Sequence, residues 1–344
     1  MDLKKYNVAT FFQGLTIGAI NTFILFELNE KSIVIASLWT VAFIAGTIIS
    51  GFNDAINLKV LNLMGFITRI SMLPLLIIKD DTLQISLLFI VGSIHAFASR
   101  KQYILLKDLV SSIKIKALTL HGSINAIGFG LGAIFSGYMH NNINIFIIMT
   151  IILSITTYLI FPKKIVKNYN KKKGLTKRDL YIASIFTIAI VPLNNSLGML
   201  IYVNIFNEKQ AALGAFLYNL GSLTSPIIKN ILIKIKKPIG ISVLISSIIF
   251  ISTLLYDNII YFLMSRIIIG GLLFAGQGLL EERAKNKEGK LNKGLEQLWQ
   301  LFSLFSLISM LVLPSIGERF GYISLGILSL ISSIIIMSLK LIIK

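Results

Sequence analysis

The sequence lacks cysteine and contains little histidine. None of its 344 residues is a cysteine, which excludes disulfides, thiolate metal sites and cysteine nucleophiles. The three histidines, His95, His121 and His140, are widely separated along the chain, and no HExxH, P-loop or GxSxG pattern is present. We therefore expect no metal site, no cofactor, no catalytic residues and no enzymatic activity.

Charge is also scarce, since only 14% of the residues are charged and 55% are hydrophobic. A soluble domain carries roughly 25% charged residues. The apolar residues occur in long runs, and a helix needs about 20 of them to cross the hydrocarbon core of a bilayer. We predict an all-α polytopic membrane protein with transmembrane helices at 7–28, 33–52, 60–78, 83–104, 118–139, 143–161, 180–205, 211–232, 238–256, 258–280, 294–315 and 320–342.

Most of the 33 basic residues fall in one of two alternating sets of segments, which include the connections between these twelve spans and some flanking span residues. One set comprises Lys4, Lys5, Lys59, Arg69, the basic residues of 100–116, 163–178, 229–237 and 283–293, Lys340 and Lys344. The opposite connections hold only Lys31, Lys79, Lys209 and Arg319. Because Lys and Arg accumulate in cytoplasmic loops, we predict a cell-membrane protein with both termini in the cytoplasm. The net charge of +18 then reflects topology and attraction to the lipid bilayer, and we expect no nucleic-acid partner.

The longest polar stretch, 162–179, separates six predicted spans from six more. This placement suggests an internal duplication. We predict an N-terminal six-helix bundle at 1–162, a basic cytoplasmic central loop at 163–178 and a C-terminal six-helix bundle at 179–344. The fold class is thus two pseudo-symmetric bundles of transmembrane helices.

Three segments of the first half carry a family resemblance. Residues 50–59 read S-G-F-N-D-A-I-N-L-K, residues 108–118 read D-L-V-S-S-I-K-I-K-A-L, and residues 128–137 read G-F-G-L-G-A-I-F-S-G. They resemble, in degenerate form, motifs of the major facilitator superfamily of secondary transporters, in its compact bacterial type. In the first segment the Asp and the final Lys match the family pattern, whereas its first Gly, its Arg and its second Gly are replaced.

The resemblance implies a monomeric transporter that works by alternating access. It implies that Asp54 is part of a charge lock at a helix end, and that Gly128, Gly132 and Gly137 form a face on which the halves rock. The last motif is commoner among exporters of this family. Ordinary tight helix packing at the glycines, and a solvated loop acid at Asp54, remain alternative interpretations.

Polar side chains inside the spans are costly unless they face a cavity or a partner. Candidate contacts to the solute are Gln13, Asn21, His95, Asn125, Asn194, Asn195, Arg266 and Gln277. Most lie on the first, fourth, seventh and tenth spans, which line the central cavity in the family that the chain resembles. A fixed positive charge at Arg266 favours an amphipathic or weakly anionic solute, although a purely structural arginine is an open alternative.

Carboxylates are missing from the middle of every predicted span. Coupling to protons would therefore fall on His95, Asp54 or Glu27. The resulting hypothesis is a transporter of a small organic solute or peptide, with export favoured and protons as the candidate coupling ion. An uptake transporter of the same fold, and a non-transporting membrane scaffold or immunity protein, are the alternatives.

Overall fold

The computed structural model describes residues 3–50, 58–113, 117–162, 177–190, 193, 202–203, 205–256, 258–283 and 318–338. All regular structure in these ranges is helical. The chain divides into two compact units, Met1–Lys171 and Lys172–Lys344, and each is described by itself.

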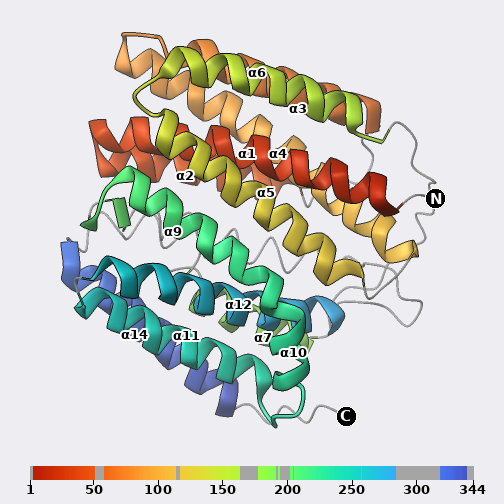
Figure 1. Cartoon of the computed structure of the whole chain (residues 1–344), viewed down its shortest axis with the longest axis vertical. Helices are drawn as coiled ribbons and strands as arrows, with labels where there is room; N and C mark the ends of the chain where they lie inside the picture. Colours follow the sequence, from red (N-terminus) through yellow and green to blue (C-terminus); the bar gives the residue numbers. More distant parts are fainter. Residues whose placement is uncertain are drawn as a thin grey trace. The chain divides into compact units, whose positions relative to one another are not determined.

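The described part of the first unit consists of helices that follow one another along the chain (Figure 1). They are α1 (Leu3–Lys31), α2 (Ile33–Ser50), α3 (Leu58–Leu75), α4 (Asp81–Ile113), α5 (Ala117–Met139) and α6 (Ile143–Ile160). Each overlaps one of the first six predicted spans. The largest difference is at α4, which continues nine residues beyond the predicted end at 104. Its 33 residues extend about 50 Å, which is longer than the hydrocarbon core.

The described helices of the second unit are α7 (Lys177–Ile190), α9 (Glu208–Gly221), η2 (Ser222–Thr224), α10 (Ser225–Leu232), α11 (Pro238–Leu255), α12 (Ile259–Arg283) and α14 (Glu318–Ser338). The predicted span 211–232 is thus interrupted by a 3-10 turn. Pro226 follows this turn, and because proline has no N–H, it cannot continue the α-helical hydrogen bonds through it. The predicted span 294–315 and much of 180–205 lie outside the described residues.

Asparagine side chains start two of these helices. Asn207 Oδ1 accepts a hydrogen bond of 2.9 Å from the Gln210 amide at the start of α9. At the start of α12, Asn258 Oδ1 accepts from the amides of Ile260 and Tyr261, at 2.9 and 3.0 Å. Each side chain satisfies amides that have no partner within the helix, so the sequence fixes where both helices begin.

Six described segments are long and apolar enough to cross a bilayer. They are Leu3–Lys31, Asp81–Lys107, Ile143–Ile160, Glu208–Leu232, Pro238–Leu255 and Ile259–Glu282. Shorter apolar helices occur at Val34–Thr47, Tyr181–Ile190 and Tyr322–Ser338. The protein is therefore a helical membrane protein.

The core of the first unit is built around α1, which packs most extensively on α5. A Cβ added at Gly18 would clash with the backbone carbonyl of Phe129, and one added at Gly132 would clash with that of Leu15. The two backbones therefore touch directly. On another side of α1, the Phe23 ring stacks on Phe146 of α6 at 3.8 Å. Since lipid gives little hydrophobic drive for association between helices, such close packing is a main source of stability.

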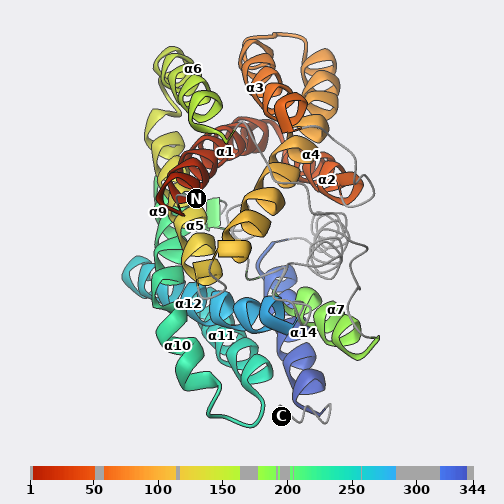
Figure 2. The same cartoon turned by 90° about the vertical axis from the view of Figure 1, so that its right-hand side faces the viewer.

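Close packing also joins α9 to α12 in the second unit. A Cβ at Gly221 would meet the carbonyl of Ile267, and one at Gly270 would meet that of Tyr218. In the same unit, the Ser329 hydroxyl of α14 donates to the Ala189 carbonyl of α7. Figure 2 shows α7 beside α14.

Helix pairings recur between the two units when helices are matched by their order among the predicted spans. The pairs α2–α4, α3–α4 and α3–α6 of the first unit correspond to α9–α12, α11–α12 and α11–α14 of the second. Figure 1 shows α3 beside α6, and α11 beside α14. Each unit thus repeats the same local arrangement of neighbours.

Candidate functional site

Gln13 lies in the interior of the first unit, fully buried on α1. Its Nε2 donates to the Ser99 carbonyl at 2.9 Å and to Gln102 Oε1 at 3.2 Å, both on α4. Gln102 is also fully buried, and its own Nε2 lies 3.4 Å from the Leu61 carbonyl and from Asn62 Oδ1 of α3. The hydrogen bonds of these two side chains therefore link α1, α3 and α4.

Arg69 joins the same group from α3 and is only 1% exposed. Its Nη2 donates to Gln102 Oε1 at 3.2 Å. The charge distribution in the sequence assigned Arg69 to a cytoplasmic connection, and this assignment is wrong, because the residue lies inside α3. Leu61, Arg69 and Met72 are buried along one side of α3, and their helical spacing was the signal that could have found it.

His95 occupies the interior of α4 and is fully buried. Its Nδ1 lies 3.4 Å from the hydroxyls of Thr68 on α3 and Ser99 on α4. These are long contacts to neutral groups. The structure thus places His95 beside the glutamine pair of α1 and α4, as part of one buried polar group in the first unit.

A second buried histidine, His121 of α5, was not predicted as a site residue. Its Nδ1 lies 2.9 Å from Asn7 Oδ1, and its Nε2 lies 3.1 Å from Thr10 Oγ1, both on α1. Because the Asn7 oxygen only accepts, Nδ1 is assigned as the donor and Nε2 accepts from the Thr10 hydroxyl. The Tyr103 ring of α4 stacks on the imidazole with centroids 6.3 Å apart, and the Lys107 ammonium lies 5.2 Å from the centroid of the Tyr103 ring.

Asn21 and Asn125 are both half-buried. The Asn21 Oδ1 atom on α1 is buried without a hydrogen-bond partner. Asn125 of α5 lies where α1 and α5 approach most closely, since a Cβ at Gly14 would meet both its backbone oxygen and its Oδ1. Neither residue belongs to the group formed by Gln13, Gln102 and Arg69.

The predicted glycine face of α5 lies against α1. A Cβ at Gly128 would clash with the Phe11 carbonyl, and one at Gly132 with that of Leu15. Gly137 is buried further along the helix. The described contacts of Gly128 and Gly132 are thus made within the first unit, which accounts for close packing of these two helices.

Glu27 lies near the C-terminal end of α1, opposite the turn that joins α5 to α6. Its Oε1 is 3.4 Å from His140 Nε2, and Oε1 of Glu30 is 3.7 Å from His140 Nδ1. The imidazole also lies edge-on to Phe23 and Phe26, with centroids 5.5 and 5.9 Å apart. Glu27 is therefore part of a cluster of two carboxylates and one imidazole at one end of the unit.

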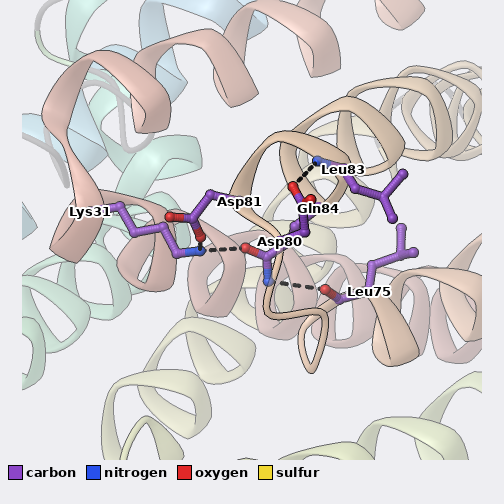
Figure 3. A network of polar contacts seen from close by, with 6 residues as sticks. All are labelled: Lys31, Leu75, Asp80, Asp81, Leu83 and Gln84. Carbon is purple, nitrogen blue, oxygen red and sulfur yellow. Dashed lines mark hydrogen bonds and ion pairs between the residues drawn. The ribbon is translucent and has the colours of Figure 1, made fainter.

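The last residue of α1, Lys31, ties the same end to the α3–α4 turn (Figure 3). Its ammonium donates to the Asp81 carboxylate and, at 2.6 Å, to Gln84 Oε1. Gln84 Nε2 in turn donates to the Leu75 carbonyl at the end of α3, at 3.0 Å. Three helix ends are thus joined through one lysine.

In the second unit, Arg266 of α12 is only 1% exposed. Its guanidinium carbon lies 5.1 Å from the ring centroid of Tyr202 and 4.6 Å from that of Tyr218 on α9. Its Nη1 donates to the Leu193 carbonyl at 3.3 Å. Two aromatic faces and a carbonyl therefore surround the arginine.

Gln277 lies further along α12 and is half-buried. Its Nε2 donates to Glu281 Oε1, one turn later, at 3.0 Å. It is separated from Arg266 by three turns of helix, so the two residues do not form one cluster. Asn194, Asn195 and Asp54 lie outside the described residues.

No protein-family model matches the sequence, and no curated protein matches it. Solved structures do match over 98% of this chain. A POT family transporter in complex with 5-aminolevulinic acid is 12% identical, with 96% of that chain covered and a TM-score of 0.69. A bacterial homologue of the iron transporter ferroportin, in an outward-facing state with soaked iron, is 12% identical, with 97% covered and a TM-score of 0.68.

A POT family transporter in complex with a thioalcohol conjugated peptide is 13% identical, with 95% covered and a TM-score of 0.66. The chain therefore shares the fold of these transporter structures, and identities of 12–13% show the fold alone. This fold agrees with the one that the sequence motifs indicated, whereas the twelve helices in two bundles stay a prediction. All three of these neighbours are transporters.

Proposed function

We propose that the protein is a secondary transporter that moves a small organic solute or peptide across the cell membrane by alternating access. The observation that carries the proposal is Arg266, a buried cation in a membrane-spanning helix of a chain with a transporter fold. Charged residues at such positions mark solute and ion pathways. The guanidinium carbon lies over the rings of Tyr202 and Tyr218, and a carboxylate of the solute is the group that a buried arginine would bind through charge-assisted hydrogen bonds.

The proposed transporter has twelve transmembrane helices in two pseudo-symmetric bundles, 1–162 and 179–344. The loop 163–178 and both termini would lie in the cytoplasm, and the protein would act as a monomer. The proposed solute contacts are Gln13, Asn21, His95, Asn125, Asn194, Asn195, Arg266 and Gln277. Proposed coupling and gating residues are His95, Asp54, Glu27, Gly128, Gly132 and Gly137, with protons as the coupling ion and export as the direction.

The test is flux into proteoliposomes under an imposed pH gradient. Two probes carry a carboxylate and resemble the ligands of the structural neighbours, namely radiolabelled 5-aminolevulinic acid and the dipeptide alanyl-alanine. We expect a pH gradient to drive uptake of at least one probe, and Arg266→Ala to lower the initial rate about tenfold or more, as the loss of a charge-assisted contact implies.

Lys209→Ala serves as the matched control, because it removes an exposed cation from the same unit. Its flux should equal that of the wild type. Equal flux in wild type and Arg266→Ala would exclude the proposed solute contact. No flux of either probe, under either direction of the gradient, would contradict transport of such solutes and favour a membrane protein without transport activity.

A further inference from the structure

Arg69 is a buried cation whose described contacts include no negative charge. Among the described residues, its hydrogen-bonded partner is the neutral Gln102 Oε1, and no carboxylate of these residues pairs with it. By contrast, Lys31 and Lys229 each pair with an acid at a helix end. A guanidinium cannot lose its charge to relieve burial. An anion beside Arg69 would stabilise its buried charge, and the described residues place no anionic group there.

Hydrogen-bonding capacity is left over at the same place. Arg69 Nη2 and Gln13 Nε2 both lie 3.2 Å from one atom, Gln102 Oε1, so the ends of the three side chains converge. The Arg69 Nε and Gln13 Oε1 atoms are both buried without a hydrogen-bond partner. Buried polar atoms are rarely unsatisfied in folded proteins, so a donor and an acceptor left open in one group point to a bound species.

Gly65 supports this convergence from α3. A Cβ added there would come to 3.0 Å from Gln102 Nε2 and 3.3 Å from Gln102 Oε1. Glycine at this position therefore leaves the space in which the Gln102 amide lies against α3, one turn before Arg69. A larger residue would displace the amide on which Arg69 and Gln13 meet.

We infer that Arg69, Gln102 and Gln13 form a binding site for a small monovalent anion inside the first unit. The anion accepts from Arg69 Nε, and water that hydrates the anion donates to Gln13 Oε1. A halide and a carboxylate share this chemistry. The site shares Gln13 with the proposed solute contacts, but it does not involve Arg266, so anion binding can be tested without measuring transport.

The test is thermal unfolding of the full-length protein in detergent micelles, at constant ionic strength. Sodium chloride and sodium acetate are each titrated against sodium isethionate, a bulkier reference anion. A ligand that binds only the folded state raises Tm in a saturable way. We expect such a rise with chloride or acetate, its complete loss in Arg69→Gln, and an unchanged rise in Lys59→Gln, which removes an exposed cation from the same helix.

Gly65→Ala provides a variant that keeps the charge. By displacing Gln102 it should weaken the apparent anion affinity about tenfold.

A rise in Tm with chloride alone identifies a halide site, and a rise with acetate alone identifies a carboxylate site. No rise in the wild type relative to isethionate, or a rise that persists in Arg69→Gln, would overturn the inference. If Arg69→Gln does not fold, the wild-type and Gly65→Ala titrations decide. A wild-type rise without flux of any probe would support this site while contradicting transport.

Discussion

The two buried arginines differ in what surrounds them. Arg266 lies between the rings of Tyr202 and Tyr218 and donates to a carbonyl, whereas Arg69 donates to a single amide oxygen. Aromatic faces stabilise a cation where water is excluded, and each such contact contributes about 0.5–2 kcal/mol. The stability of the second unit should therefore depend on both tyrosine rings.

Replacing Tyr218 by leucine should lower the free energy of unfolding by about 2–3 kcal/mol, because it removes both the aromatic face and buried ring area. Tyr218→Phe keeps the ring and should cost less than about 1 kcal/mol. Thermal unfolding in detergent measures both. Tyr256→Leu is the control, since Tyr256 is 67% exposed, and it should change Tm little. Equal losses in Tyr218→Leu and Tyr218→Phe would show that the hydroxyl, rather than the ring, carries the effect.

The sequence predicted some of these residues and missed others for a physical reason. Gln13, His95 and Arg266 stood out because each is a polar side chain far from the ends of an apolar run. Arg69 was not predicted as a buried site residue, because it was counted together with the basic residues that mark cytoplasmic connections. Gln102 and His121 act through partners on distant parts of the chain, 89 and 111 residues away, and no local pattern reveals such contacts.

At the scale of helices, the closest contacts are made by glycines. In α5, Gly132 and Gly122 are both helical, but their surroundings differ. A Cβ at Gly132 would clash with the backbone of α1, whereas a Cβ at Gly122 would meet only the Tyr103 hydroxyl, at 3.9 Å. This pair of positions separates the effect of packing from the intrinsic helix preference of alanine.

Gly132→Ala should lower the free energy of unfolding by about 1–3 kcal/mol, because backbone atoms of α1 cannot move aside without loss of packing along the whole interface. Gly122→Ala should leave stability unchanged or raise it by up to about 1 kcal/mol, since alanine is the better helix former. Unfolding in a denaturing detergent, followed by circular dichroism, gives both values. Similar changes in the two variants would contradict direct backbone contact between α1 and α5.

Helix positions were predictable because apolar runs and turns between them are local features. The predicted spans 143–161 and 238–256 match Ile143–Ile160 and Pro238–Leu255 within one residue. The end of α4 was misplaced, because Lys107 is buried against other helices and its charge does not mark a loop. The 3-10 turn before Pro226 was also missed, since one proline near the end of a run does not show whether a helix bends or stops.

At the scale of the molecule, the absence of cysteine makes the predicted topology directly testable. Each single-cysteine variant carries one reactive thiol in an otherwise cysteine-free chain. Lys79 lies in the turn between α3 and α4, and Lys236 lies in the turn between α10 and α11, and both are exposed. The alternation of basic loops places Lys79 on the outer side and Lys236 in the cytoplasm.

In intact cells, a membrane-impermeant maleimide should therefore label Lys79→Cys and leave Lys236→Cys unlabelled. Permeabilised cells should give labelling of both, which controls for access and reactivity, and the cysteine-free parent gives the background. Turns α3–α4 and α10–α11 are separated by an odd number of predicted spans, so the two turns lie on opposite sides of the membrane. Loss or gain of a single span between them would place both turns on the same side. Labelling of both variants in intact cells, or of Lys236→Cys alone, would contradict the predicted topology, in which both termini lie in the cytoplasm.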